Sequence, residues 1–185
     1  ECAYAINDAG AEILIVDEAF KAAGHAIQEA AKGIKTIIYC GDGDTPDGML
    51  NYETILAAAE PAKDVDRGGD DLAGVFYTGG TTGFPKGVML SHTNLYVGGI
   101  SNSEALKIVD DAVYLHAAPM FHIADLLFFT AVSFAAGTHV VIPMFTPQAT
   151  LEAIQTHQPS HVLLVPVMLQ MVLQHPEFDS FDVSS

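Results

Sequence analysis

A segment rich in glycine and threonine, residues 77–92, holds the residues best suited to chemistry. It reads Tyr-Thr-Gly-Gly-Thr-Thr-Gly-Phe-Pro-Lys-Gly-Val-Met-Leu-Ser-His and follows an apolar run that predicts a strand. Glycines let the backbone approach a ligand closely, and successive N–H groups in such a turn surround an anion. Three threonine hydroxyls add hydrogen-bond donors, and Lys86 adds a charge suited to phosphate. The segment predicts a phosphate-binding loop, with a flexible glycine-rich hairpin as the alternative.

Other known patterns fit less well. The loop is not a Walker-type P-loop, because Pro85 stands where the second glycine belongs and Gly87 where Ser or Thr belongs. The acidic turn at residues 42–53 imitates a calcium loop, but Asp47 takes the place of the required glycine. The chain has eight histidines but no His-Glu-x-x-His or Cys-x-x-Cys pattern, so we expect no metal ligands in it.

The elements that must position this loop follow from alternating apolar and amphipathic stretches. Short continuous apolar runs predict buried strands at residues 13–16, 36–40, 73–78, 112–116, 138–142 and 161–165. Helices are expected at residues 17–31, with Asp17 as N-cap and Gly33 as the stop, and at 93–108, 123–136 and 147–157. Strands separated by helices predict an α/β fold with a mostly parallel sheet flanked by helices on both faces.

The segment from Tyr77 to His92 closely resembles the signature of the adenylate-forming enzymes, which include acyl-CoA synthetases, firefly-type luciferases and peptide-synthetase adenylation domains. Their pattern is Tyr-Thr-Ser-Gly-Ser/Thr-Thr-Gly-x-Pro-Lys-Gly-Val, often followed by Ser-His. Gly79 replaces the usual serine, a variant also familiar among fatty acyl-CoA synthetases. The resemblance implies that the loop holds the β- and γ-phosphates of ATP. The implied contacts are Thr78, Gly79, Gly80, Thr81, Thr82, Gly83 and Lys86.

A second resemblance lies at Pro119-Met-Phe-His-Ile-Ala-Asp-Leu. In acyl-CoA synthetases a Pro-x-Phe-His stretch begins the helix beside the acyl pocket, and its histidine lies near the carboxylate to be activated. His122 is therefore the implied catalytic residue, although outside this pattern a histidine beside a phenylalanine is most often structural. Peptide-synthetase adenylation domains usually lack this Phe-His, which favours an acyl-CoA synthetase. The candidates for the acyl wall are Leu126, Leu127 and Phe128.

The resemblance covers nearly the whole chain and implies a full-length protein most like a fatty acyl-CoA synthetase. Such an enzyme uses ATP with Mg²⁺ and CoA to convert a carboxylic acid to an acyl-adenylate and then to a thioester. The magnesium-binding Glu of the family belongs to a later motif, Tyr-Gly-x-Thr-Glu, which these 185 residues do not contain. The alternatives are an aryl-acid or luciferase-like ligase, and a non-catalytic α/β module that binds an anion.

The resemblance also implies the domain organisation. We expect residues 1–185 to form a single compact α/β unit, an internal part of a larger N-terminal AMP-binding domain. The rest of that domain and the C-terminal lid domain are expected to lie outside it. Alone, such a piece is expected to be inactive and to self-associate through uncovered sheet edges and apolar faces.

Composition excludes several classes of protein. With 16% charged and 50% hydrophobic residues the chain is not disordered, and a net charge of −16 offers no basic surface for nucleic acid. The most apolar stretch, residues 126–145, is interrupted by Gly137 and Pro143, so we expect no membrane span. Two cysteines, Cys2 and Cys40, make no disulfide framework and predict mostly buried thiols in a cytoplasmic protein.

Overall fold

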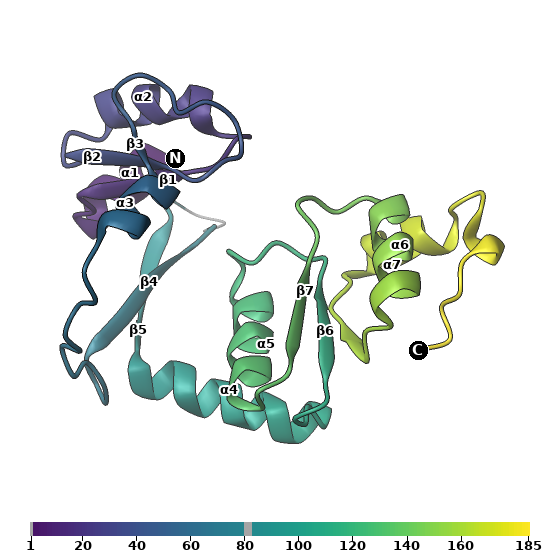
Figure 1. The fold of residues 1–185 in the computed structure, drawn as a ribbon. Coiled ribbons are helices and arrows are strands. Elements are labelled where there is room, and N and C mark those ends of the chain that lie inside the picture. The colour runs from purple at the N-terminus through teal and green to yellow at the C-terminus, as the bar shows by residue number, and fades with distance from the viewer. Residues whose placement is uncertain (1, 80–82) are drawn as a thin grey trace. The chain divides into compact units, whose positions relative to one another are not determined.

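The computed structural model describes residues 2–79 and 83–185, which divide into two compact units (Figure 1). The first unit comprises the residues up to 67 together with residues 74–90, and the second comprises residues 68–73 and 91–185. The sequence predicts a single unit. The difference has a physical reason, because the exposed run from residue 59 to 70 has one large apolar side chain, Val65, and contributes to no core. Among the described residues each cluster of buried apolar side chains belongs to one unit.

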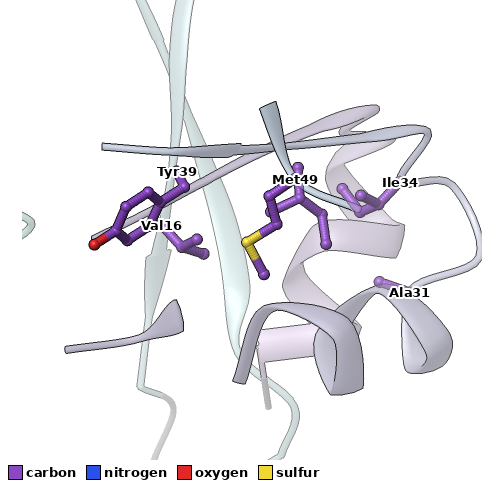
Figure 2. Packing of buried hydrophobic residues seen from close by; sticks show 6 residues of the cluster. Val16, Ala31, Ile34, Tyr39 and Met49 are labelled. Atoms are coloured by element: carbon purple, nitrogen blue, oxygen red, sulfur yellow. The ribbon is translucent and has the colours of Figure 1, made fainter. Parts of the chain in front are cut away.

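The first unit contains a small parallel sheet with strand order β1-β2-β3. Its strands are β1 (Ile13–Val16), β2 (Thr36–Tyr39) and β3 (Leu50–Asn51). Its helices are α1 (Cys2–Ala9), α2 (Lys21–Ala30) and α3 (Tyr52–Ala58). A separate two-stranded sheet pairs β4 (Leu72–Thr78) with β5 (Lys86–Ser91). The core of this unit is made by Val16, Ala31, Ile34, Ile37, Tyr39 and Met49, and Figure 2 labels all of these except Ile37.

The second unit contains a three-stranded parallel sheet with strand order β7-β6-β8. Its strands are β6 (Val113–His116), β7 (Thr138–Val141) and β8 (His161–Val162). Its helices are α4 (His92–Leu106), α5 (Ile123–Phe134), α6 (Pro147–His157) and α7 (Pro166–Leu173), followed by a 3-10 turn, η1 (Phe178–Ser180). The predicted α/β fold with parallel strands and flanking helices is confirmed, and its strands are divided among three sheets.

Strand β6 is covered on both faces. Successive side chains of a strand point to opposite sides, so neighbouring residues of β6 pack against different helices. Tyr114 packs with Ala131 and Val132 of α5. Leu115 packs with Ala153 of α6 and Met168 of α7. Figure 1 accordingly shows α5 on one side of β6 and β7, and α6 with α7 on the other. Alternate side chains of β6 therefore enter two different cores.

Several element boundaries differ from the sequence-based expectations. The helix expected at residues 17–31 begins at Lys21, because the Asp17 carboxylate accepts a hydrogen bond from the N–H of Phe20 (3.0 Å) and so forms a turn before the helix. The strand expected at 161–165 ends at Val162, ahead of Pro166, which begins α7. Both cysteines are free and exposed, so the prediction of mostly buried thiols is wrong.

Candidate functional site

Thr78 and Lys86 lie together where the glycine-rich segment leaves one strand and enters the next. Thr78 is the last residue of β4 and Lys86 the first residue of β5, and these strands are paired. The Oγ1 of Thr78 is 3.5 Å from the carbonyl oxygen of Lys86. Both side chains are exposed, so a hydroxyl and an ammonium group are free to meet an anion at the same end of this sheet. The predicted contacts Gly80, Thr81 and Thr82 lie outside the described residues.

The glycines of the segment differ in whether the space around them would admit a larger side chain. Gly79 faces open space, so the serine usual in the family would fit there without a clash. Gly83 has a φ of +153°, a conformation that favours glycine, and it also faces open space. At Gly87, a Cβ would lie 2.7 Å from Cγ1 of Val75 and 3.1 Å from Cζ of Tyr77. Gly87 is therefore needed for close packing between β5 and β4.

Helix α1 contacts two residues of the glycine-rich segment, Tyr77 and Phe84. The Tyr77 hydroxyl donates a hydrogen bond to the Asp8 carboxylate (2.6 Å), and the ring of Phe84 stacks on Tyr4 at a centroid distance of 5.3 Å. The hydrogen bond to Asp8, with desolvation and the charge of that carboxylate, raises the pKa of Tyr77 to about 12. The phenol is therefore a stable donor at neutral pH, and α1 contacts both the end of β4 and a residue of the loop that the sequence predicts to bind phosphate.

His122 lies in the second unit, at the N-cap of α5. Its backbone N–H donates to the carbonyl of Pro119 (3.0 Å), and its carbonyl accepts from the N–H of Leu126 (3.2 Å), so the backbone fixes its place. The imidazole makes no capping hydrogen bond, is exposed and lies beside the ring of Phe121 at a centroid distance of 4.7 Å. His122 is therefore available to a ligand.

An apolar cavity of about 450 Å³ opens next to this segment, at the carboxyl ends of β6 and β7. Ligands of parallel α/β sheets bind outside these strand ends. The lining residues are His116, Ala117, Ala118, Pro119, Met120, Phe121, Val141, Ile142, Pro143, Met144 and Phe145. The three wall residues expected from the sequence are absent from this lining. Phe128 stacks on Tyr114 instead, and Leu127 packs against Gly98 of α4.

Sequence reasoning missed a buried polar cluster beside this cavity. The Asp125 carboxylate, with no exposed surface, accepts hydrogen bonds from the Tyr114 hydroxyl (2.9 Å) and from Nδ1 of His116 (2.7 Å). The Nε2 of His116 is hydrogen-bonded to Nδ1 of His139 (2.8 Å), and Nε2 of His139 to the Ser133 hydroxyl (3.1 Å). One carboxylate within the apolar run Ile-Ala-Asp-Leu-Leu-Phe-Phe, opposite polar residues at alternate positions of a strand, was the available signal.

Burial also changes two pKa values in this cluster. Desolvation, followed by the hydrogen bond to Asp125 and the charge of that carboxylate, raises the pKa of Tyr114. Desolvation and the neighbouring His116 lower the pKa of His139, with Asp125 acting in the opposite direction. Tyr114 therefore stays a donor to Asp125, and the neutral form of His139 is favoured.

Residues 2–79 and 83–185 contain no group of three or more His, Cys, Asp or Glu side chains placed to hold a metal ion. The same residues include no helix long and apolar enough to cross a membrane.

A family model described as AMP-binding enzyme matches residues 1–185. The chain is 30% identical to indoleacetate–CoA ligase of Aromatoleum aromaticum, over 97% of this chain and 35% of that protein. It is 30% identical to the medium/long-chain-fatty-acid–CoA ligase FadD8 of Mycobacterium tuberculosis, over 99% of this chain and 33% of that protein. The crystal structure of ATP-bound MatB from Rhodopseudomonas palustris matches with a TM-score of 0.76 and 34% identity, over 95% of this chain and 34% of the other. The chain therefore spans about a third of the length of these relatives.

Proposed function

Because the chain belongs to the family of AMP-binding enzymes, we propose that the full-length protein joins a carboxylic acid to CoA at the expense of ATP. A carboxylate oxygen of the acid attacks the α-phosphorus, the bond to pyrophosphate breaks, and an acyl-adenylate forms. The thiolate of CoA then attacks the acyl carbon, and AMP leaves with the electron pair of the broken carbon–oxygen bond. The first step asks the protein mainly to position and neutralise phosphate charge.

The observation that carries this proposal is the pairing of Thr78 and Lys86 at one end of β4 and β5. In a chain of net charge −16, Lys86 and Lys107 are the only Lys or Arg residues after residue 67. A hydroxyl and a cation on neighbouring strand ends, joined by a loop rich in glycine, suit the β- and γ-phosphates of ATP. We assign phosphate contact to Thr78, Thr81, Thr82 and Lys86, and close backbone approach to Gly79, Gly80 and Gly83.

The acid is assigned to the second unit. His122 is exposed at the start of α5 and is proposed to lie beside the carboxylate that is activated. The neighbouring cavity of about 450 Å³ has a mainly apolar wall, which suits the hydrocarbon part of an acid. We propose a fatty acid as the substrate, with an aryl acid as the second candidate because the first relative described above is an indoleacetate–CoA ligase.

Magnesium is expected with ATP, but the described residues do not supply a ligand set for it. No step is therefore assigned to a metal bound by this chain. The cytoplasmic location predicted from the sequence is part of the same proposal.

The proposal is tested with the full-length protein and a panel of acids, including acetate, octanoate, palmitate, indoleacetate and ferulate. We expect exchange of labelled pyrophosphate into ATP that depends on an apolar acid, and formation of the acyl-CoA thioester on addition of CoA. Pyrophosphate exchange without formation of the acyl-CoA thioester would overturn the choice of CoA as acceptor. The protein would then be another kind of adenylate-forming ligase. No exchange with any acid, combined with retained anion binding, would support the non-catalytic module instead.

The chain of 185 residues alone should form no acyl-CoA, because adenine and ribose contacts needed for orientation belong to motifs it does not contain. It should also self-associate. Strand β1 is at the edge of its sheet, and Ile13 and Ile15 are 59% and 57% exposed. Sedimentation of the chain over a range of concentrations should show dimers or larger species, and Ile13→Lys with Ile15→Lys should favour the monomer. A monomer at every concentration would contradict this expectation.

A further inference from the structure

The second unit buries a carboxylate, that of Asp125, completely. Asp125 is the third residue of α5, a helix whose other members are apolar or small, and its side chain is fully buried. A buried carboxylate is costly unless it is paired and hydrogen-bonded. Here each oxygen has a partner, since Oδ1 accepts from Tyr114 and Oδ2 from His116. These two hydrogen bonds offset the cost of burying the carboxylate. They also fix a specific geometry that an apolar side chain would not impose.

The hydrogen-bonded chain continues to the edge of the unit. His116 contacts His139 through a second ring nitrogen, and His139 contacts Ser133. With the Nδ1–H of His116 donated to Asp125, Nε2 of a neutral His116 accepts from the Nδ1–H of His139, and Nε2 of His139 accepts from the Ser133 hydroxyl. No buried side-chain nitrogen or oxygen in the described part of the chain lacks a hydrogen-bond partner.

The two inner members of this cluster enclose the segment that carries the candidate site. His116 is the last residue of β6, and Asp125 is in the first turn of α5. Their hydrogen bond joins positions nine residues apart and closes a loop over residues 117–124. That loop includes His122, and residues 116–121 form one wall of the apolar cavity. Both the wall and the N-terminus of α5 are therefore held by one pair of buried side chains.

We infer that Asp125 and His116 are positioning residues for acid activation. They hold residues 117–122 so that His122 meets the substrate carboxylate at the mouth of the cavity. This inference rests on the proposed function. Tyr114 acts with them by fixing the second oxygen of Asp125, and its contribution is smaller because it does not lie at the end of the loop.

The kinetic test uses Asp125→Asn and Tyr114→Phe in the full-length protein. Asp125→Asn keeps the shape but replaces one acceptor oxygen with an NH2 donor, so either the Tyr114 hydroxyl or the Nδ1–H of His116 loses its acceptor. We expect the KM for the acid to rise at least tenfold while the KM for ATP stays within twofold. Tyr114→Phe should show the same pattern more weakly, and it remains informative if Asp125→Asn folds poorly.

The matched control is Thr150→Val. Thr150 of α6 is also fully buried in the second unit, and it does not line the cavity. Its hydroxyl donates to the carbonyl of Thr146, the N-cap of that helix (2.8 Å). Thr150→Val should lower thermal stability without changing the KM for the acid.

A double-mutant cycle then compares Asp125→Asn and His122→Ala. If Asp125 acts through His122, the combined loss falls well short of the product of the single losses. The inference would be overturned if the loss in the double variant equalled the product of the two single losses, or if Thr150→Val showed the same kinetic change as Asp125→Asn.

A readout that does not depend on activity separates this inference from the proposed function. Hydrogen–deuterium exchange of the full-length protein should show at least tenfold faster exchange within residues 117–126 in Asp125→Asn, with peptides of α6 unchanged. Unchanged local exchange would overturn the positioning role even in an active ligase. Faster local exchange in a protein without acid-dependent pyrophosphate exchange would overturn the proposed function and the positioning role in catalysis, leaving Asp125 as a structural residue.

Discussion

The Tyr77 hydroxyl and the Asp8 carboxylate lie 2.6 Å apart although 69 residues separate them in the chain. The bond joins α1 to β4 at the residue before Thr78. The strand end that carries Thr78, the hydroxyl proposed to contact phosphate, is thus fixed from outside its own sheet. Tyr77, a residue of the family signature, therefore has a role in hydrogen bonding and packing within the first unit.

Tyr77→Phe should change how the stability of the chain depends on alkaline pH. The pKa of Tyr77 is about 12 in the folded chain, against roughly 10 for an unfolded tyrosine. Between these values the folded state binds more protons, so the stabilising contact is complete below pH ~10 and is lost as pH rises toward 12. The urea midpoint should decrease less between pH 9 and pH 11 in Tyr77→Phe than in the unchanged chain. Asp8→Asn should act in the same direction, and additive effects of the two changes would contradict the pairing.

Lys86→Ala in the full-length protein should weaken adenylation and leave the fold intact. The side chain is exposed at the start of β5, so its removal leaves no cavity. We expect a loss of about tenfold in pyrophosphate exchange, equivalent to about 1.4 kcal/mol, a modest value for a charge-assisted contact. Lys63→Ala is the control, because it removes an equal charge from the exposed acidic run. Equal rates in the two variants would argue against phosphate contact by Lys86.

The sequence predicts the regular elements well where local signals agree. Helix α6 begins and ends as expected, since Thr146 caps it with a side-chain oxygen (3.0 Å from the N–H of Ala149) and Pro147 occupies its first turn. Strand β1 also has its expected bounds. The sequence does not predict strand β5, because its residues belong to the signature segment. The short β3 and α3 carry too little periodicity to predict.

The sequence indicates only part of the candidate site. The signature indicates that Thr78 and Lys86 act together, and the structure shows them at one sheet end. The cluster around Asp125 depends on which strand faces α5 and in which register, and no local pattern contains that information. Tyr114 and His116 share a face because they alternate along β6, but the identity of their partner is a tertiary fact.

His139→Asn should make the stability of the chain less sensitive to acid. Burial and the neighbouring His116 lower the pKa of His139 below its usual value near 6.5, while the charge of Asp125 opposes this effect. The unfolded state therefore binds more protons as pH falls below about 6.5, and stability is lost in that direction. Urea midpoints measured from pH 8 to pH 5 should decrease less in the variant. An identical slope in both proteins would show that His139 does not titrate differently on unfolding.

The turn that ends α5 offers a paired test of backbone strain, because two adjacent residues there should respond in opposite directions. Ala136 has a φ of +56°, where a Cβ is unfavourable, while the N–H of Gly137 donates to the carbonyl of Val132 (2.9 Å). Ala136→Gly relieves strain of about 1–2 kcal/mol and loses part of that gain to the greater entropy of unfolded glycine. The net gain should be about 0.5–1 kcal/mol, or roughly 1–4 °C in Tm.

Gly137→Ala should instead destabilise the second unit. A Cβ at this position would lie 2.7 Å from the carbonyl oxygen of Ala112 and 3.0 Å from Cγ1 of Val132. The first contact is with backbone, which cannot move without disturbing the hydrogen bond from the N–H of Thr138 to that same oxygen (2.8 Å) at the start of β7. Overpacking of this kind costs about 1–3 kcal/mol. Thermal unfolding of both variants decides the matter, because a general preference for alanine over glycine in the chain would lower the Tm of Ala136→Gly and raise that of Gly137→Ala.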